Sequence, residues 1–433
     1  MALSKSYFPK FLNLSLLLIS ITSNAQTDTK DRIINNAVQL NITNAKIDPK
    51  ALQQFGEAIG DSKIVMLGEQ DHGDGSTFLV KAELIKYLHE VKGFNVLAFE
   101  TDIFSMNYAW EEVIQNKISI DSAIKTSIFP IWTNCKECVP TFEYINQMTT
   151  TPSPIILTGF DNQLLFKSAF KRLKPELIKY LAEAKIDFIS TQYFANVFPS
   201  DIDSLLKIFR FNRDNKLEKI LLLQKMVDTL KVITSQLMLI KKQSDYFFLI
   251  LENCISYCEV LLSVLKNEND FISGSIRDRQ MANNLIWLIK NKFQNNKIIV
   301  WAANSHIVKS YTPQFNTKFA KAPSMGSIIA SDSILKETTY VLGFTGYSGT
   351  YGRATISKEY KISKPKSNSL EYWLHDANFN DCFINFNLMK LTKEQFYMNC
   401  FNWRDYKLDW QNYYDGMIYL ENIEPCSKIN LIR

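Results

Sequence analysis

The chain has 433 residues, of which 46% are hydrophobic and 21% charged, a composition typical of a globular protein and not of a disordered one. Lysine and arginine number 49 against 44 aspartate and glutamate residues, so the formal net charge is only +5. Because the sequence also shows no dense basic run interleaved with aromatic residues, we expect no nucleic-acid partner.

The first 25 residues have the features of a secretory signal peptide. Lys5 and Lys10 give a basic start, and the apolar stretch from Phe11 to Ile21 is too short to span a membrane. Ser23-Asn24-Ala25 then provides the small residues of a cleavage site. An uncleaved membrane anchor is the alternative. We expect an exported protein, periplasmic or secreted, with no integral membrane segment after cleavage and a folded part at residues 26–433.

The chain has seven cysteines, an odd count that leaves at least one free or paired between chains. Cys135 and Cys138 are spaced as Cys-x-x-Cys, but no second such pair completes a structural zinc site. In an oxidising compartment a local disulfide between these two is the simpler expectation. Cys254 and Cys258 are four residues apart on an expected helix, which favours packed core thiols.

Short apolar and β-branched runs outside the middle of the chain are expected strands: Lys63–Leu67, Asn95–Phe99, Pro154–Thr158, Lys297–Ala302, Thr339–Phe344 and Met417–Leu420. Several are apolar throughout, which is typical of strands buried on both faces of a mostly parallel sheet. Ser76–Val91, between the first two runs, has the pattern of an amphipathic helix. This strand-helix-strand unit implies that the first two strands form a parallel pair.

A long central segment is predicted to be helical. No glycine occurs between Gly159 and Gly274, and apolar residues recur at helical spacing in Asn215–Lys241 and Asp245–Lys266. We therefore predict an α/β fold with a central, mostly parallel sheet flanked by helices, and a large helical insertion at about residues 165–293.

Polar residues follow four of the expected strands at the point where each strand ends. They are Glu69 and His72 after the first strand, Glu100 after the second, Asp161 after the third and His306 after the fourth. In open α/β sheets, ligands bind beyond the carboxyl ends of the strands. If these strands are parallel neighbours, the five side chains converge at one edge of the sheet.

Such a set of residues has the groups needed for acyl hydrolysis by water. A neutral imidazole takes a proton from water near neutral pH, and a carboxylate on its other nitrogen fixes the tautomer and raises its basicity. A second histidine or a cation then stabilises the oxyanion. We expect His72, Glu69, Glu100 and His306 to be the catalytic residues. A structural, hydrogen-bonded histidine is the alternative for His72 and for His306.

Other hydrolase sites are less well supported. Gly346–Thr350 departs from the nucleophile elbow G-x-S-x-G at its last position, and His89–Gly93 departs from the zincin motif H-E-x-x-H at its last position. The two histidines and two glutamates could also ligate zinc or another divalent ion. We favour a site without metal or cofactor, because the ligands have no tight spacing.

Four glycines lie within ten residues at positions 343, 346, 349 and 352. This clustering predicts a flexible loop, either an ordinary hairpin or a lid over the site. Tyr347 lies within it, and we expect this residue to contact the substrate.

Several motifs in one order resemble those of the erythromycin esterase family. They are Gly68-Glu69-x-x-His72-Gly73, Glu100, Arg277-Asp278-Arg279 with Met281, Asn304-Ser305-His306 and Ser324-Met325-Gly326, with a weaker match at Tyr414-Asp415-Gly416. Apart from that weaker match, the resemblance extends from about residue 60 to about residue 345.

The resemblance implies an α/β sheet core with added helices and hydrolysis of a macrolactone ester, as in macrolide antibiotic resistance. It implies that His72 is the general base, that Glu69 and Glu100 support it, and that His306 belongs to the same site. The family usually has arginine where this chain has Lys81, which keeps the charge but loses the planar fork. We therefore take Lys81, with Asp161 and Tyr347, as substrate-binding residues.

The family often has threonine where this chain has Asp71, an extra negative charge beside the motif histidine. The expected partner is a small-molecule ester. Two alternatives stay open: a metal-dependent hydrolase that uses the same residues, and a non-catalytic periplasmic protein that binds a hydrophobic ligand or haem. The sequence does not indicate an oligomeric state.

Overall fold

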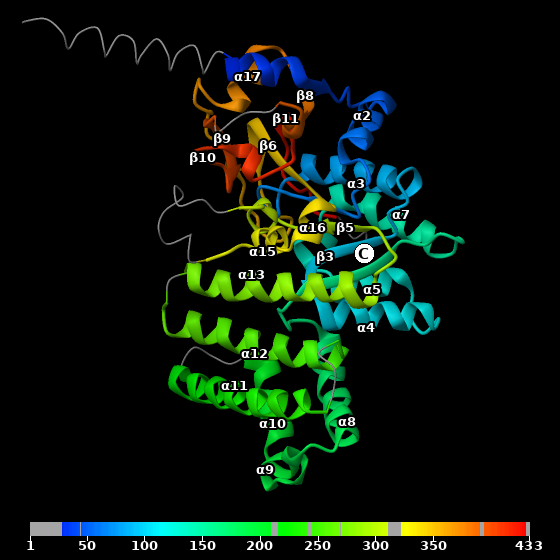
Figure 1. Cartoon of the computed structure of the whole chain (residues 1–433), viewed down its shortest axis with the longest axis vertical. Helices are drawn as coiled ribbons and strands as arrows, with labels where there is room; N and C mark the ends of the chain where they lie inside the picture. Colours follow the sequence, from blue (N-terminus) through cyan, green and yellow to red (C-terminus); the bar gives the residue numbers. More distant parts are fainter. Residues whose placement is uncertain are drawn as a thin grey trace, which may run out of the picture.

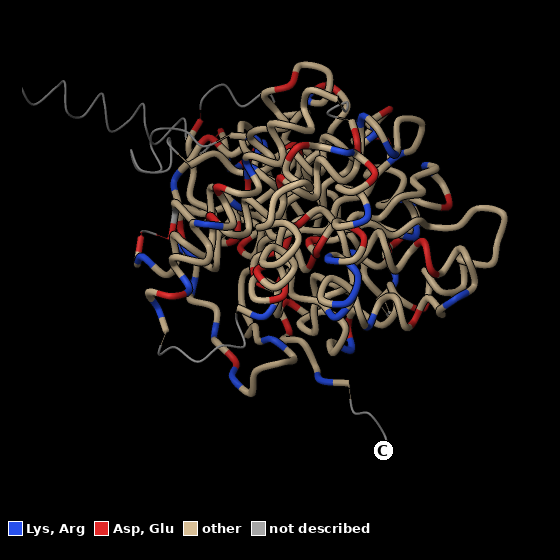
Figure 2. Tube along the Cα trace, turned by 90° about the horizontal axis from the view of Figure 1, so that it is seen from below, with Lys and Arg blue, Asp and Glu red and all other residues tan. Residues whose placement is uncertain are grey.

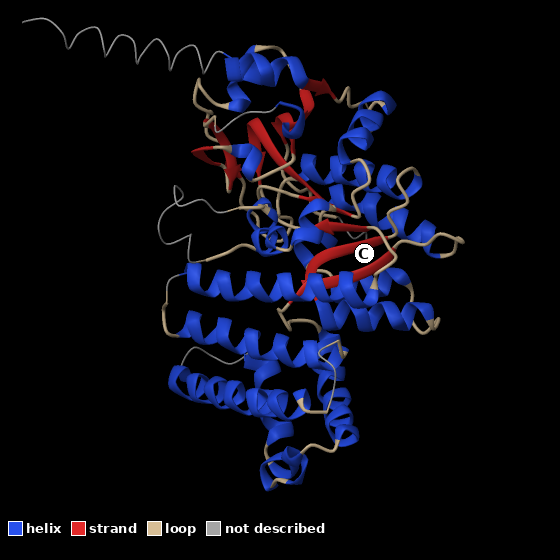
Figure 3. Ribbon diagram, viewed as in Figure 1, coloured by secondary structure: helices blue, strands red, loops and turns tan. Residues whose placement is uncertain are grey.

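The computed structural model describes residues 28–43, 45–208, 215–240, 244–268, 270–310, 322–389 and 394–429. The predicted signal peptide, residues 1–25, lies outside the described residues. Figure 1 shows a mixed α/β part above a stack of long helices, and Figure 3 shows that the strands are confined to the α/β part.

The α/β part is built on a nine-stranded sheet. Its order is β1 (Ala37–Gln39), β8 (Asp381–Asn385), β11 (Gly416–Ile423), β6 (Thr339–Tyr351), β2 (Ile64–Leu67), β5 (Ile298–Trp301), β3 (Val96–Asp102) and β4 (Ile156–Asp161), and β7 (Tyr360–Lys361) pairs with β6. The six strands predicted from the sequence are the six from β11 to β4, and every adjacent pair among them is parallel. The antiparallel strands β8 and β1 extend the sheet at one edge. The predicted mostly parallel α/β fold is confirmed.

One predicted pairing is wrong. The first two predicted strands, β2 and β3, lie parallel in the sheet but are not neighbours, because β5 is inserted between them. Ile298 of β5 pairs with Ile64 on one side and with Val96 on the other. A strand-helix-strand pattern fixes direction but cannot reveal a strand that enters the gap from much later in the chain.

Alternate residues of β2 belong to two separate cores. Val65 and Leu67 are buried in one core, together with Phe55 and Phe78 from helices near the start of the chain. Ile64 and Met66 are buried in the other, which also contains the central helices. This arrangement explains why the strand is apolar at every position, because a strand covered by helices on both faces has no solvent-facing residue.

The helices between β1 and β4 are α2 (Pro49–Ile59), α3 (Gly75–Glu90), α4 (Ile103–Ile114), α5 (Ile120–Ser127), α6 (Pro130–Thr133), η1 (Lys136–Cys138) and α7 (Val139–Thr149). Those after β5 are α14 (Asn304–Ile307), α15 (Met325–Ser331), α16 (Ser333–Glu337), α17 (Leu370–Asp376), α18 (Phe386–Met389) and η9 (Trp410–Asn412). A separate antiparallel hairpin is formed by β9 (Phe396–Phe401) and β10 (Arg404–Leu408).

Between β4 and β5 the described elements are all helical. They are η2 (Ala169–Leu173), α8 (Lys174–Ala184), η3 (Asp187–Ser190), α9 (Gln192–Asn196), α10 (Phe198–Lys207), α11 (Lys216–Met238), α12 (Tyr246–Leu265), α13 (Asp270–Trp287) and η6 (Leu288–Lys292). In Figure 1, α13 lies next to the sheet, α12 packs on α13, and α11 packs on α12. This order places α13 where its side chains can reach the sheet edge.

Helix α12 is the one helix among the described residues that is long and apolar enough to cross a membrane. In its most apolar window, 67% of the residues are buried inside the protein, as in the core helix of a folded domain. Cys254 and Cys258 are buried free thiols on this helix, which confirms their prediction as core residues. Charged residues of both signs are interspersed along the chain in Figure 2, in keeping with the small net charge.

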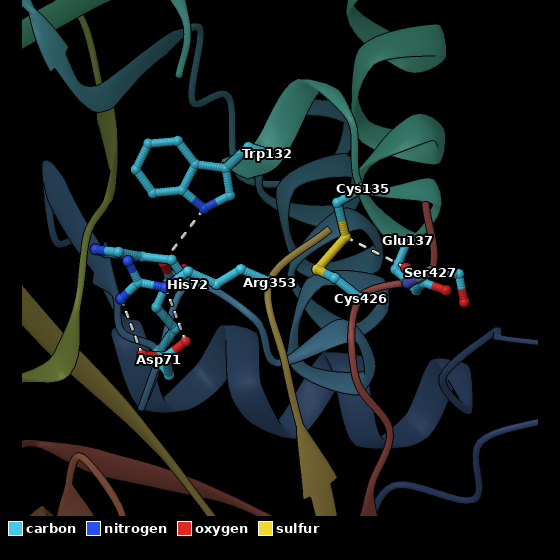
Figure 4. Close-up of a disulfide and its surroundings, with 9 residues drawn as sticks. Asp71, His72, Trp132, Cys135, Glu137, Arg353, Cys426 and Ser427 are labelled. Carbon is cyan, nitrogen blue, oxygen red and sulfur yellow. Dashed lines mark hydrogen bonds and ion pairs between the residues drawn. A yellow bond between two sulfur atoms is a disulfide. The ribbon is translucent and has the colours of Figure 1, made fainter. Parts of the chain in front are cut away.

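The predicted disulfide between Cys135 and Cys138 is wrong. Cys135 is bonded to Cys426, 291 residues away in the sequence, and Cys138 is a buried free thiol. The C-terminal segment runs antiparallel beside Cys135, and a β-bridge between Cys135 and Lys428 brings the nearby Cys426 within bonding distance. The pair is shown in Figure 4. Short sequence separation therefore predicted the wrong partner for Cys135, because its true partner approaches only in the folded protein.

The predicted glycine-rich loop is also wrong. Residues 343–351 are part of β6, which is 13 residues long and pairs with β11 along most of its length. The glycines serve close packing: a Cβ at Gly343 would lie 2.7 Å from Met417, and Gly349, at φ +110°, lies against the backbone of Ile423. This stretch is therefore a tightly packed strand and not a mobile lid.

Candidate active site

The carboxyl ends of four parallel strands are in register. Leu67 of β2 and Phe99 of β3 both pair with Trp301 of β5, and Phe99 pairs on its other side with Gly159 of β4. The polar residues that follow these positions therefore emerge at one edge of the sheet. Their side chains form two networks, one around Glu69 and His72 and one around Glu100 and His306. The backbone after β5 contacts both networks, because the N–H of Asn304 donates to the carbonyl of Glu69 and the N–H of Ala303 donates to the side chain of Glu100. The two networks together are called the cluster below.

His72 is held by Glu69. Its Nδ1 lies 2.7 Å from Oε1 of Glu69, and its side chain is 19% exposed while that of Glu69 is fully buried. A carboxylate accepts at this distance, so Nδ1 carries the proton and Nε2 keeps its lone pair in the neutral ring. The pair fixes the tautomer that a general base requires.

The turn that carries His72 is fixed by its own backbone contacts. The carboxylate of Asp74 accepts from the backbone N–H groups of Gln70 and Asp71 at 3.2 and 3.1 Å. Gly73 allows close approach of another segment, because a Cβ there would lie 2.7 Å from the backbone nitrogen of Arg353. The glycine after the histidine is therefore required by packing.

Glu69 is also bound by two donors from behind. Nζ of Lys81 lies 2.5 Å from Oε2, and the indole N–H of Trp132 donates to Oε1 at 3.3 Å. Lys81 is fully buried, and its ammonium lies 4.3 Å from the ring centroid of Trp301. Burial lowers the pKa of Lys81, and the Glu69 carboxylate opposes that effect.

The structure thus differs from the prediction that Lys81 contacts the substrate. The side chain lies beneath Glu69, where its charge compensates the buried carboxylate. Asp161, which was also predicted to bind substrate, is likewise paired with a cation. Asp161 is fully buried and accepts from Nε and Nη2 of Arg277 at 3.0 and 2.8 Å, so it holds an arginine in place.

Arg277 links Asp161 to Glu100. Its Nη2 donates to Oε1 of Glu100 at 2.8 Å, and the other oxygen of Glu100 accepts from the backbone N–H of Ala303 at 3.0 Å. Burial raises the pKa of Glu100, but the charges of His306, Arg277 and His72 outweigh it, so the net pKa lies well below the usual range. Glu100 is therefore ionised at neutral pH.

His306 lies between two carboxylates and also lies next to Arg277, whose Nη1 is 3.4 Å from Nε2 of the ring. Its Nδ1 lies 2.5 Å from Oδ1 of Asp278 and its Nε2 lies 3.3 Å from Oε1 of Glu100. Burial alone would lower the pKa of His306, but these two carboxylates raise it to about 10. His306 is therefore a cation at neutral pH.

Tyr347, which was also predicted to contact the substrate, packs elsewhere in the structure. Tyr347 stacks on His375 with ring centroids 3.8 Å apart and an interplanar angle of 9°, and Nδ1 of His375 lies 2.7 Å from Glu421. The contacts that the structure gives Tyr347 are thus with α17 and not with the cluster around Glu100.

Three residues of the cluster were assigned no role from the sequence. Asp278 and Arg277 lie in a motif that carries the family resemblance, but only the fold shows that they hold His306, Glu100 and Asp161. Trp132 has no sequence signal, because it reaches Glu69 from a short helix 63 residues away.

Arg353 forms an ion pair with Asp71, the acidic residue that stands where the family often has threonine. Its Nε and Nη2 donate to the two oxygens of Asp71 at 3.2 and 3.0 Å, a bidentate pair. Figure 4 shows Arg353 beside His72 and Trp132. The extra negative charge next to the motif histidine is thus neutralised by a cation from a distant segment.

A metal would have to compete with these contacts. Glu69 already faces the ammonium of Lys81, and Glu100 faces the guanidinium of Arg277. Within the described residues, Cys135, Glu137 and Cys426 have ligand atoms close enough together to hold a metal ion. The two cysteines of this group are bonded to each other in the disulfide.

Comparison with known proteins gives relatives over most of the chain. YbfO of Bacillus subtilis (strain 168), provisionally named a hydrolase, is 29% identical over 422 residues, which cover 91% of this chain and 90% of that protein. Erythromycin esterase type II of Escherichia coli is 24% identical over 334 residues, covering 67% of this chain and 70% of that protein.

Solved structures share the fold. A Bacillus cereus protein superposes with a TM-score of 0.67 at 18% identity, covering 94% of this chain and 99% of that one. A histidine-to-asparagine mutant of erythromycin esterase EreC, in its open conformation, has a TM-score of 0.62 at 16% identity, covering 92% of this chain and 99% of that one.

The erythromycin esterase family model matches residues 89–423. This range contains Glu100, Asp161, Arg277 and His306 but begins after His72, whose place in the cluster rests on the contacts described above. Because the match spans far more than half of the sequence, the chain belongs to the erythromycin esterase family.

Proposed function

We propose that this protein is a hydrolase that cleaves a carboxylic ester by attack of water, with His72 as the general base. One observation carries the proposal: the contact of 2.7 Å between Nδ1 of His72 and Glu69 leaves Nε2 free on a partly exposed ring. Family membership and the names of the relatives support hydrolysis.

In the proposed reaction, Nε2 of His72 takes a proton from water while the water oxygen bonds to the ester carbonyl carbon. The carbonyl electrons move to the oxygen, and the cationic His306, at the same sheet edge, stabilises the negative charge. When the intermediate collapses, the bond to the alcohol oxygen breaks and His72 returns the proton to it. The products are a carboxylic acid and an alcohol.

The other residues of the cluster keep these two histidines in different states. Glu69 holds His72 in one tautomer, and the buried Lys81 and Trp132 hold Glu69. Asp278 and Glu100 hold His306 as a cation, and Arg277 holds Glu100. General-base catalysis of this kind contributes about 10²- to 10⁴-fold in rate.

The substrate class we propose is a bulky or cyclic ester, macrolide-like at its most specific. The name of the Escherichia coli relative supports trying erythromycin first. We also propose that the protein acts after export, in the periplasm or outside the cell. The bond between Cys135 and Cys426 supports this, because structural disulfides persist in oxidising compartments.

The test is turnover of erythromycin and of 4-nitrophenyl esters by the wild type and by His72→Asn. Asparagine keeps an N–H that can donate to Glu69, so we expect the melting temperature to change little while kcat falls by about 10²- to 10⁴-fold. The matched control is His375→Asn, because His375 also has a glutamate 2.7 Å from Nδ1 but lies outside the cluster. Its kcat should equal that of the wild type.

Unchanged turnover in His72→Asn would remove the general-base role. Loss of turnover on chelation, restored by one divalent metal, would favour the metal-dependent alternative. Absence of turnover on every ester, with saturable binding of haem or another hydrophobic ligand, would favour the binding protein.

A further inference from the structure

A cavity of about 600 Å³ lies between the end of β6, β7 and the β9–β10 hairpin. Its lining is unusually cationic, with four basic side chains against one carboxylate: Arg353, Lys358, Lys361, Arg404 and Asp71. Because Asp71 already forms a bidentate pair with Arg353, the other three cations are not neutralised by the lining. Such a cavity attracts an oxyanion.

Aromatic rings form a continuous wall of the same cavity. Tyr360 and Tyr351 are stacked with ring centroids 5.4 Å apart, and Tyr351 lies 5.7 Å from Trp403. Nζ of Lys358 lies 4.6 Å from the ring centroid of Tyr360. Flat faces next to cationic groups suit a cyclic ligand that carries a negative charge.

The residue at one end of this wall is held at a conformational cost. Asn402 and Trp403 form the two-residue turn between β9 and β10, with φ of 49° and 58°. Asparagine and glycine favour such a turn, whereas a bulky tryptophan at positive φ is strained. Trp403 is 7% exposed, and its indole N–H has no hydrogen-bond partner within the described part of the chain. Backbone strain of this kind is concentrated at functional sites.

Arg353 joins the cavity to the catalytic edge. It lines the cavity, pairs with Asp71 next to His72, and packs its backbone against Gly73. The hydrogen bond to Asp71 raises the pKa of Arg353, and the charges of Asp71, Glu69 and Glu100 add to this effect. The cavity and the reacting edge therefore share one wall.

We propose that this cavity binds a ring that carries a carboxylate, with the oxyanion on Lys361 and Arg404 and the ring against Tyr351 and Trp403. That this ring is part of the substrate rests on the proposed function, because the cavity adjoins His72. An acidic sugar and an aromatic acid share this chemistry.

Calorimetric titration of the whole protein with two matched pairs of probes tests the proposal. One pair is methyl β-D-glucuronide with methyl β-D-glucoside, and the other is benzoate with benzamide. We expect the acid of at least one pair to bind at least about tenfold more tightly than its neutral partner, which is the effect of about 1.4 kcal/mol from a charge-assisted contact. The pair that binds identifies the type of ring. Raising the salt concentration should weaken that binding.

Two variants assign the binding to this cavity. The double variant Lys361→Gln, Arg404→Gln should weaken binding of the acid by about tenfold or more. Lys407→Gln removes the same charge from an exposed position of β10 outside the cavity and should leave the affinity unchanged. Equal affinity for each acid and its neutral partner, no binding of either acid, or an equal loss in Lys407→Gln overturns the proposal.

The proposal and the esterase function can fail separately. Binding of the acid requires no turnover, so it should persist in His72→Asn. Ester hydrolysis by a protein that binds neither acid would remove only the cavity proposal. Binding of the acid by a protein that hydrolyses no ester would remove only the esterase proposal.

Discussion

At the scale of single residues, the two histidines of the cluster differ in the partners of their ring nitrogens. His72 has one carboxylate on Nδ1, whereas His306 has carboxylates near both nitrogens. One carboxylate orients a base, and two carboxylates hold a cation. This difference supports the roles proposed for the two residues.

The raised pKa of His306 leads to a pH-dependent stability. The folded pKa is about 10, and the ordinary value is about 6.5, so the folded state binds the extra proton between them. The stabilisation is therefore complete below about pH 6.5 and is lost as the pH rises through about 10. Urea unfolding across this range should show a fall in the free energy of unfolding that is smaller in His306→Gln by at least about 1 kcal/mol.

His375→Gln is the control for this measurement, because His375 has one carboxylate partner and its side chain is 43% exposed. It should leave the pH dependence as in the wild type. Identical pH profiles for the wild type and His306→Gln would contradict the cationic state assigned to His306.

The sequence identified some of the titratable residues of the proposed site, but it did not identify Arg277 and Asp278 or show which side chains face solvent. His72, Glu69, Glu100 and His306 could be placed together because each follows an apolar strand. Lys81 and Asp161 were predicted to contact substrate, yet both are fully buried as partners of other charged residues. Whether a charge faces solvent or a buried counter-ion depends on packing between segments far apart in the sequence, which no local pattern records.

At the scale of elements, the active site depends on how α13 is anchored to the sheet. Asn284 of α13 donates to the backbone carbonyl of Phe160 at 2.8 Å and exchanges side-chain hydrogen bonds with Asn253 of α12 at 2.7 and 2.8 Å. All of these groups are buried, and Arg277 lies two helical turns away on the same helix. These hydrogen bonds fix the position of α13 along the sheet so that Arg277 can contact Glu100.

Replacing Asn284 by leucine should therefore affect both stability and catalysis. It leaves the carbonyl of Phe160 and the amide of Asn253 buried without their partner, which costs about 1–3 kcal/mol. We expect urea unfolding to show this loss and ester turnover to show a lower kcat. The exposed neighbour Asn283 offers the control, and Asn283→Ala should change stability by no more than about 0.5 kcal/mol. Equal stability of Asn284→Leu and Asn283→Ala would contradict the anchoring role.

Strands were predictable where both faces are buried and not elsewhere. The six predicted runs are apolar because helices cover both faces of the central sheet. Strand β8 contains Asp381 and Asn385 and was missed, because an antiparallel strand next to the edge of the sheet need not be apolar throughout. The length of β6 was misjudged because glycine usually marks a loop, whereas here it allows β11 and Tyr414 to approach.

At the scale of the whole molecule, the C-terminal segment is tied to the segment that carries Trp132. The disulfide joins Cys135, near Trp132 of the proposed active site, to Cys426 after the last strand. The C-terminal segment also contacts the motif directly, because the N–H of Cys426 donates to the carbonyl of Gly73 at 3.0 Å. The position of the His72 turn thus depends on residues at the far end of the chain.

Breaking the disulfide should lower stability more than it lowers catalysis. A bond that closes so long a loop contributes on the order of 2–5 kcal/mol, largely by restricting the unfolded chain. We expect dithiothreitol to lower the melting temperature of the wild type but not that of the double variant Cys135→Ala, Cys426→Ala, which should already melt at the lower temperature. Below that temperature kcat should stay close to the wild-type value, because hydrogen bonds of Gly73 and Lys136 still hold the C-terminal segment. A reductant effect of equal size in both proteins would assign the sensitivity to other thiols and contradict the role given to this bond.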